Sequence, residues 1–198
     1  MNLPDATPQG FKLACEVMTR AEEQDLIALL RASGLSESHF TDEPDNRRST
    51  MSYLYKYDMP SQRFIPAPPM PEGYHAIARR AAAFAGLAFA DIAHCALNGY
   101  EPGAMIQSHI DMPCWDRVVG ISLGAAATLN LRSVGPDGEQ VLPIELPPRS
   151  MYLLRDEVRH DWEHGIPRVE HRRWSITFRW FTEEGMLESY TTAASRRY

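Results

Sequence analysis

The chain has 198 residues, of which 44% are apolar and 23% charged, ordinary values for a globular protein that can bury a core. Its formal net charge of −6 excludes a bulk attraction to polyanions, so any contact with a nucleic acid would need a local basic patch. The sequence holds no apolar run of transmembrane length and no CxxC pair among its 3 cysteines, and we therefore expect a cytoplasmic protein with reduced thiols and no membrane contact. We also expect a monomer.

The N-terminal part of the chain begins with a predicted helix. Thr19 and Glu22 have the spacing of a capping box, in which each side chain accepts a hydrogen bond from the other residue's backbone. Apolar residues then recur at helical intervals up to Gly34, a residue type common just after helix ends. These signals predict a helix over about residues 20–33.

A tyrosine-bearing strand and a second helix follow. Residues 51–58, MSYLYKYD, alternate as a strand does, which should place three rings on one face: Tyr53, Tyr55 and Tyr57. These rings could form a stacking platform for a base, or they could simply cover a core. After a proline-rich link, helical spacing predicts a second helix near residues 73–85, ending at Gly86.

The composition changes from residue 91, where short β-rich runs alternate with Gly, Pro and Asp at close intervals. This spacing is typical of an all-β sandwich or barrel, and the segment VGPDGEQ has the composition of a hairpin turn. We therefore predict a mainly β single domain with an N-terminal α+β elaboration and a double-stranded β-helix (jelly-roll) core. The elaboration covers about residues 1–90, the core about 91–182, and a C-terminal tail 183–198.

The stretch NGYEPGAMIQSHID ends in a His-x-Asp pair, His109 and Asp111. Residues i and i+2 of a strand project from the same face, so an imidazole and a carboxylate at this spacing can bind one metal ion. Two neutral imidazoles and one carboxylate form the facial triad of non-haem Fe(II), which leaves positions open for a cosubstrate and dioxygen. For the pair alone, a surface hydrogen bond on an edge strand is the alternative interpretation.

A third ligand would have to come from a later histidine. The chain after the pair offers three of them, namely His160, His164 and His171. We select His164, because Gly165 and Pro167 end the strand-like run around it and could present its ring at a strand terminus.

Two arginines, Arg173 and Arg179, belong to one predicted strand. Fully extended, this strand directs them to the same side about 20 Å apart, which is too far for both to grip one carboxylate. Their roles must therefore differ. One arginine can clasp a carboxylate as a bidentate fork, while the other serves a different group.

Four motifs occur along the chain in the order N-x-Y-x-P-G, H-x-D, H-G-I and R-x-x-x-T-F-R. In this order they resemble the AlkB-type Fe(II)- and 2-oxoglutarate-dependent dioxygenases, closely over about residues 90–181. The earlier run RRSTMSYLYKYD is similar to the variable substrate-covering region of that family, with less specificity.

The resemblance implies a role for each motif residue. His109, Asp111 and His164 would bind Fe(II). Five residues would contact the cosubstrate 2-oxoglutarate: Asn98, Tyr100, Arg173, Ser175 and Arg179. Among them, Arg173 matches the arginine that pairs with the distal carboxylate, and Arg179 lies near the metal-proximal end. The implied reaction consumes O2 and 2-oxoglutarate, releases succinate and CO2, and hydroxylates or demethylates a substrate.

Two positions depart from the pattern of the base-repairing members of the family. Pro113 stands where those enzymes carry a second acidic residue, and Ser175 stands where they often have asparagine. The run PPRSMYLLRDEVRHDWEHGI resembles the branch that contains tRNA-modifying and protein-acting homologues. Recognition of adenine-type bases is therefore not implied.

The substrate itself is less constrained by the sequence. Five residues are candidates for substrate contacts, although each could also have an ordinary structural role: Arg47, Arg48, Tyr53, Tyr55 and Trp115. The basic pair and the tyrosines favour a modified nucleobase in tRNA or another alkylated nucleic acid, whereas the net charge of −6 favours a protein side chain or a small metabolite. A non-catalytic binding module is the third class, and a chain of that class would be free to lose a ligand or an arginine.

Overall fold

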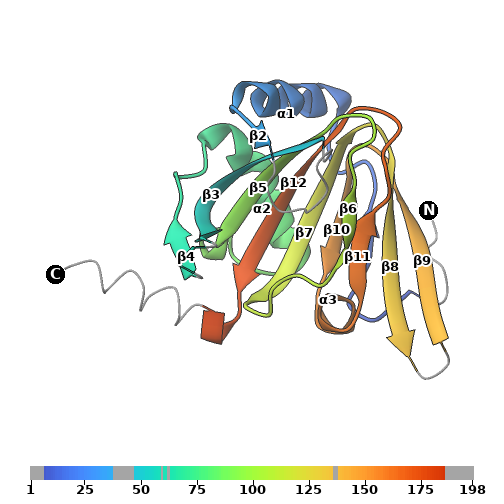
Figure 1. Cartoon of the computed structure of the whole chain (residues 1–198). Helices are drawn as coiled ribbons and strands as arrows, with labels where there is room; N and C mark the ends of the chain where they lie inside the picture. Colours follow the sequence, from blue (N-terminus) through green and yellow to red (C-terminus); the bar gives the residue numbers. More distant parts are fainter. Residues whose placement is uncertain (1–6, 38–46, 59, 62, 136–137, 186–198) are drawn as a thin grey trace.

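The computed structural model describes residues 7–37, 47–58, 60–61, 63–135 and 138–185, and Figure 1 shows their two sheets. The larger sheet has eight strands in the order β1 (Lys12–Ala14), β10 (Ser150–Leu154), β7 (Trp115–Gly124), β12 (Arg173–Phe181), β5 (His94–Tyr100), β3 (Arg48–Asp58) and β2 (Ser36–Glu37), with β4 (Arg63–Pro66) beside β3. The smaller sheet has the order β6 (Ile106–His109), β11 (Glu163–Ile166), β8 (Ala127–Gly135) and β9 (Gly138–Leu146). Their pairings are antiparallel, which confirms the predicted jelly-roll core.

The predicted hairpin around VGPDGEQ is present, because β8 and β9 pair up to Gly135 and Gly138. Residues 136–137 of that segment lie outside the described residues. Between the two sheets lies an apolar core that includes Tyr100, Leu131 and Leu154. The face of the larger sheet that borders this core is called the inner face below.

Helices cover the outer face of the larger sheet. They are α1 (Arg20–Ala32) and α2 (His75–Ala85), with short 3-10 turns at Glu72–Tyr74 and Phe89–Asp91, while α3 (Asp156–His160) precedes β11. In Figure 1, α2 lies behind β5 and β12. Both predicted helices are thus confirmed, and Gly86 ends the second one with a left-handed φ of 71°. Within the described ranges, none of the helices combines the length and the apolar composition needed to cross a bilayer.

The predicted capping box at the start of α1 is also present. The Thr19 hydroxyl accepts a hydrogen bond from the Glu22 backbone at 3.2 Å, and the Glu22 carboxylate accepts one from the Thr19 backbone at 2.7 Å. The same carboxylate pairs with Arg80 of α2 at 2.5 Å. This arginine and the capping hydrogen bonds lower the pKa of Glu22 from 4.5 to about 2.

We expect a Glu22→Gln variant to lose stability in a pH-dependent way. Because the folded-state pKa of Glu22 is depressed, its contribution is complete above pH 4.5 and is lost as the pH falls towards 2. The difference in Tm between wild type and variant, followed by circular dichroism, should therefore shrink across this interval. A difference that does not change with pH would contradict the assignment.

The prediction that three tyrosines of β3 share one face is wrong. Leu54 has a φ of 72°, which interrupts the alternation of the strand between its neighbours. Tyr53 consequently lies in the core of the outer face, 6.2 Å from the ring of Tyr74. Tyr55 and Tyr57 instead join a separate aromatic cluster with Phe64, Trp115 and Phe181.

The inner face of the larger sheet carries a row of small polar side chains. Register aligns five residues across neighbouring strands: Thr50, Asn98, Ser175, Ser122 and Ser150. On one side of this row Tyr100 pairs in register with Arg173, and on the other side His94 pairs with Arg179. Since paired residues of antiparallel strands project from the same face, the sheet places the two arginines at opposite ends of a polar surface.

Candidate active site

Two histidines and one carboxylate meet at the edge of the smaller sheet. His109 ends β6 and is the register partner of His164 on β11, and their ring centroids lie 4.5 Å apart. Asp111 follows two residues after His109, and each of its oxygens lies 3.8 Å from the Nε2 atom of one histidine. The candidate ligand atoms of the three residues all lie within 4.8 Å of one another. Metal bonds of about 2.1 Å place neighbouring ligands about 3 Å apart, so a small contraction would let all three bind one ion.

The local sequence explains why these residues can approach each other. At Gly165, an added Cβ would lie 2.9 Å from the Ile106 carbonyl oxygen and 3.0 Å from the Ser108 backbone. Glycine therefore allows β11 to lie directly against β6, and the pairing shifts register just after His164. The H-G part of the H-G-I motif thus has a steric reason.

The two imidazoles are free to act as ligands. The Nδ1 atom of His109 lies 2.9 Å from the Gln107 carbonyl oxygen, to which it can only donate, and this leaves the Nε2 lone pair directed to the site. The Nδ1 atom of His164 is buried and has no hydrogen-bond partner within the described ranges. Burial lowers the pKa of His164 to about 4, and His109 and Arg179 add to this effect, so the ring is neutral at pH 7.

The carboxylate keeps its charge in spite of burial. Burial alone would raise the pKa of Asp111, but Arg179 and the two histidines hold it well below the ordinary value. Arg179 grips both oxygens, with Nε 3.3 Å from Oδ2 and Nη2 3.1 Å from Oδ1. A neutral His164 imidazole beside an ionised Asp111 carboxylate matches the protonation states that a divalent metal ion requires.

At the other end of the polar row, Arg173 is a buried cation with unused donors. Its side chain is 0% exposed, its guanidinium lies 4.7 Å from the centroid of the Tyr100 ring, and Nη2 donates to Ser122 Oγ at 3.0 Å. Nε and Nη1 have no hydrogen-bond partner, and no ion pair of Arg173 occurs within the described residues. A buried guanidinium without an ion-pair partner raises the free energy of the folded protein unless an anion binds to it. The site therefore fits a ligand that carries a carboxylate at the end away from the metal site.

Three further predicted contacts lie on the same face, with Tyr100 beside Arg173 and with Asn98 and Ser175 between the two arginines. The Tyr100 hydroxyl and Ser175 Oγ are 3.2 Å apart, and Asn98 Nδ2 donates to the same Oγ at 3.4 Å. All three side chains are nearly buried on the inner face. The structure therefore gathers the five predicted cosubstrate residues on one surface, where Arg179 contacts Asp111 and two donor atoms of Arg173 have no acceptor within the described residues.

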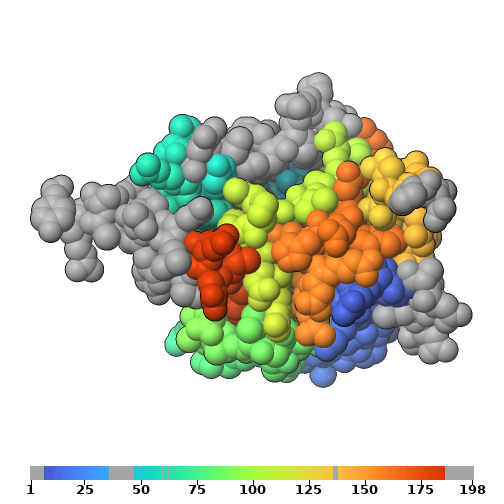
Figure 2. Space-filling model, turned by 90° about the horizontal axis from the view of Figure 1, so that it is seen from below, coloured from blue at the N-terminus to red at the C-terminus, as the bar shows by residue number. Residues whose placement is uncertain are grey.

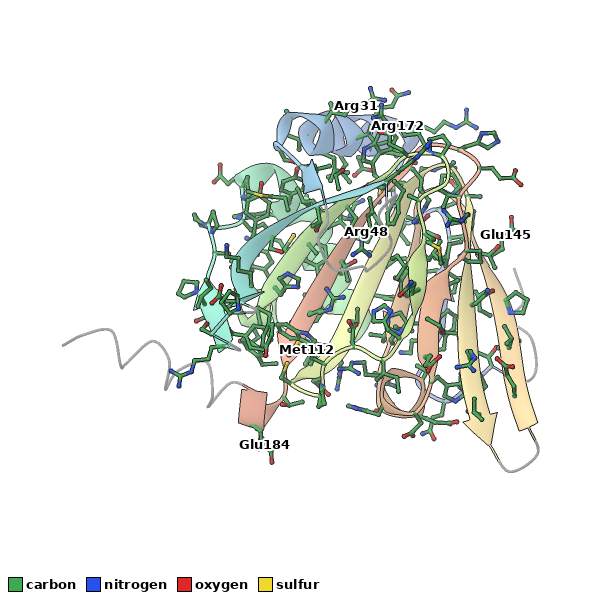
Figure 3. All side chains as sticks on the ribbon, in the orientation of Figure 1. Arg31, Arg48, Met112, Glu145, Arg172 and Glu184 are labelled. Atoms are coloured by element: carbon green, nitrogen blue, oxygen red, sulfur yellow. The ribbon has the colours of Figure 1, made fainter. Side chains whose placement is uncertain are left out.

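The five candidate substrate residues are not gathered in this way. Arg47 is exposed and donates to the Pro102 carbonyl oxygen, whereas Arg48 is the register partner of Tyr100 and lies over the inner face in Figure 3. Tyr53 is in the core of the outer face. Tyr55 and Trp115 share the aromatic cluster, in which Trp115 is only 4% exposed.

Three residues that the sequence did not single out border the site. They are His94, Tyr152 and Arg159. His94 contacts Arg179, with Nδ1 3.2 Å from Nη1. The Tyr152 ring lies over Gly120, where a Cβ would come within 2.2 Å of it, and burial raises the pKa of this phenol to about 12. These contacts join strands far apart in the chain, so spacing gives no signal for them.

Arg159 supports the segment that follows the carboxylate. It is fully buried in α3 and donates to the carbonyl oxygen of Met112, directly after Asp111. Figure 2 shows the end of β12, the segment before β7 and the α3–β11 region side by side on one face. The Thr182 backbone also donates to the Cys114 carbonyl oxygen at 2.8 Å, which ties the end of β12 to the segment before β7.

A jelly roll with two imidazoles and a carboxylate at one end of a polar surface, and a buried arginine at the other, defines a metal-dependent oxygenase that binds an acidic cosubstrate. The chain belongs to the 2OG-Fe(II) oxygenase superfamily, whose family model matches residues 17–183. Members of this superfamily use Fe(II), 2-oxoglutarate and O2, and the prediction of a dioxygenase with these cofactors is confirmed.

Comparison with known proteins also supports the AlkB-type resemblance. The chain is 29% identical over 177 residues to the tRNA (carboxymethyluridine(34)-5-O)-methyltransferase ALKBH8 of Macaca fascicularis, a match that covers 82% of this chain and 25% of that protein. The ALKBH8 protein of Xenopus tropicalis is 31% identical over 169 residues, with 83% of this chain and 26% of the relative covered. The chain thus spans about a quarter of the length of these relatives. The solved structure of OsALKBH1 has a TM-score of 0.69 at 16% identity, over 89% of this chain and 99% of that one, which supports the fold.

Proposed function

We propose that the chain hydroxylates or demethylates a modified nucleobase in RNA or DNA, with tRNA as the first candidate. The observation that carries the substrate class is the similarity over 82% of the chain to a protein named for its action on tRNA. Arg48 lies over the inner face as the register partner of Tyr100, and we include it among the residues that could border a bound nucleobase. Cytoplasmic location and a monomeric state belong to the same proposal.

In this proposal, His109, Asp111 and His164 hold Fe(II) by two nitrogens and one oxygen. Together with 2-oxoglutarate and O2, the bound iron supplies the oxidising power that converts a substrate C–H bond into C–OH, while the cosubstrate becomes succinate and CO2. If the carbon is an N-methyl group, the hydroxylated product loses formaldehyde and the net reaction is demethylation.

The protein residues bind and orient the reactants. Arg173 would clasp the distal carboxylate of 2-oxoglutarate with Nε and Nη1, its two unused donors. The hydroxyl groups of Tyr100 and Ser175, 3.2 Å apart, would hydrogen-bond along the bound cosubstrate. Arg179 would keep Asp111 ionised and oriented, since it contacts both carboxylate oxygens.

An alternative substrate is a protein side chain or a small metabolite, and one observation favours it. The chain carries a formal charge of −6, and three exposed arginines near the loop after Tyr100 are engaged in contacts within the chain. Arg47 and Arg168 donate to the carbonyl oxygens of Pro102 and Gly103, and Arg172 pairs with Glu101. A polynucleotide would have to compete with these contacts.

Turnover on defined substrates tests the choice. We expect the wild-type protein, with Fe(II), 2-oxoglutarate and O2, to form succinate faster in the presence of total tRNA or alkylated oligonucleotides. Mass spectrometry of the digested nucleosides should show a lost methyl group or an added oxygen. The same reaction with His109→Ala is the control for non-enzymatic oxidation. If succinate formation responds only to peptides or small metabolites, and the nucleosides are unchanged, the alternative replaces the proposal.

A further inference from the structure

His94, the first residue of β5, connects the metal site to a neighbouring strand. Its Nδ1 atom lies 3.2 Å from Arg179 Nη1, and its Nε2 atom lies 3.2 Å from the hydroxyl oxygen of Ser52 on β3. Arg179 in turn contacts both oxygens of Asp111. A continuous set of hydrogen bonds therefore runs from Ser52 through His94 and Arg179 to the carboxylate.

The direction of each hydrogen bond follows from chemistry. A guanidinium has donors only, so His94 Nδ1 must accept from Arg179. The proton of the neutral ring then sits on Nε2, which donates to Ser52 Oγ. Burial, with Arg179 adding to it, lowers the pKa of His94 to about 3, so the ring stays neutral across the physiological range.

The ring of His94 is also held by packing. It stacks on Trp115, with centroids 5.6 Å apart and an interplanar angle of 20°. Trp115 stacks in turn on Phe181 at 4.7 Å and 11°. Because Trp115 is only 4% exposed, this stack is part of a packed interior and restricts rotation of the imidazole.

Arg179 is thus fixed from two sides. Nε and Nη2 donate hydrogen bonds to Asp111 and Nη1 donates one to His94, so each of the three nitrogens has a defined acceptor. Without the imidazole, the guanidinium could turn about its long side chain and carry the carboxylate with it. The orientation of a ligand carboxylate controls metal affinity, because outer partners set the direction of its lone pairs.

We propose that His94 is a positioning residue of the metal centre: it holds Arg179 in the orientation that directs Asp111 to the ion. This inference rests on the assignment of His109, Asp111 and His164 to Fe(II), and it is independent of the substrate class. It gives a role to a histidine for which the sequence offers no partner.

Two substitutions at the same position separate hydrogen bonding from packing. His94→Leu retains an apolar side chain of similar bulk but has no acceptor. In His94→Asn, Oδ1 takes the place of Nδ1 and can still accept from Arg179. Anaerobic titration of each protein with Fe(II) in the presence of 2-oxoglutarate, followed by the metal-to-ligand charge-transfer band, gives the Kd for Fe(II). We expect a Kd about tenfold higher for His94→Leu but only about threefold higher for His94→Asn, which keeps the acceptor for Arg179 and loses the donor to Ser52.

Two further variants complete the test. His75→Leu changes a half-buried histidine on the outer face and should leave the Kd unchanged, whereas Ser52→Ala removes the partner of Nε2 and should raise the Kd about threefold. Ser52→Ala keeps the inference testable if His94→Leu does not fold. An unchanged Kd in His94→Leu, or in Ser52→Ala if that variant alone folds, would overturn it, as would an equal loss in His94→Asn and His94→Leu. A wild-type protein without the band would instead count against the iron assignment.

Discussion

A His109→Ala variant should lose Fe(II) binding and turnover while its melting temperature stays within about 2 °C of wild type. The reason is the exposure of this proposed ligand. Its side chain is 41% accessible, and its hydrogen bond to Gln107 lies within its own strand. Truncation therefore creates no cavity, but it removes one of the two imidazoles that the proposed metal site requires.

The matched control is a histidine that the sequence offered and we did not select. His160 is exposed on α3, and His160→Ala should retain the charge-transfer band and turnover. Anaerobic titration with Fe(II) and 2-oxoglutarate measures the first effect, and circular dichroism measures the melting temperature. Normal iron binding in His109→Ala would overturn the ligand assignment. Asp111 is less suitable for this purpose, because its removal would leave Arg179 without its buried counter-charge.

Local signals in the sequence predicted local structure well. The capping box at Thr19 and the glycine after α2 act within one turn of a helix, so neighbouring residues determine them. The strands after residue 91 could be recognised because their alternation reflects burial between two sheets. The same alternation failed at β3, where the positive φ of Leu54 moves Tyr53 to the opposite face. Leucine rarely adopts a positive φ, so the residue type at position 54 does not predict this irregularity of the strand.

The residues of the candidate site also fall into two groups, those that local sequence signals identify and those that only the fold brings together. His109 and Asp111 share a strand and its continuation, and His164 could be chosen among three histidines because a glycine and a proline mark the end of its strand. The other two, His160 and His171, are exposed. His94 and Tyr152 could not be found, because their partners belong to other strands and depend on sheet order. Sheet order is a property of the whole fold and has no signature in residue spacing.

The two arginines of β12 illustrate how one strand can serve two ends of a reaction site. Arg179 neutralises a carboxylate that the protein itself supplies, whereas Arg173 has two donors without a protein acceptor. An arginine that is already paired has few unused donors for a ligand. An unpaired buried arginine raises the free energy of the folded protein and therefore favours binding of an anionic ligand. The charge balance of the interior is therefore incomplete on the side of Arg173, where a dianionic cosubstrate would complete it.

This imbalance leads to a prediction with opposite effects on binding and on stability. Replacing Arg173 by methionine should raise the Kd for 2-oxoglutarate by about a hundredfold, since removal of a charged partner from a buried carboxylate costs about 3 kcal/mol. Fe(II) affinity should change little, because Arg173 contacts Tyr100 and Ser122 but none of the proposed metal ligands. Without the cosubstrate, Arg173→Met should melt at a higher temperature than wild type, because an apolar side chain replaces an incompletely paired buried cation.

Thermal melts with and without 2-oxoglutarate measure both effects in one experiment. Saturating cosubstrate should raise the Tm of wild type through binding to the folded state and should raise that of Arg173→Met far less at the same concentration. Arg172→Met is the matched control, because Arg172 is an exposed neighbour that pairs with Glu101, at the top of Figure 3. An Arg173→Met protein that still responds to 2-oxoglutarate like wild type would refute the assignment. A variant that loses the response but melts below wild type would show that Arg173 contributes more to packing against Tyr100 than its unused donors cost.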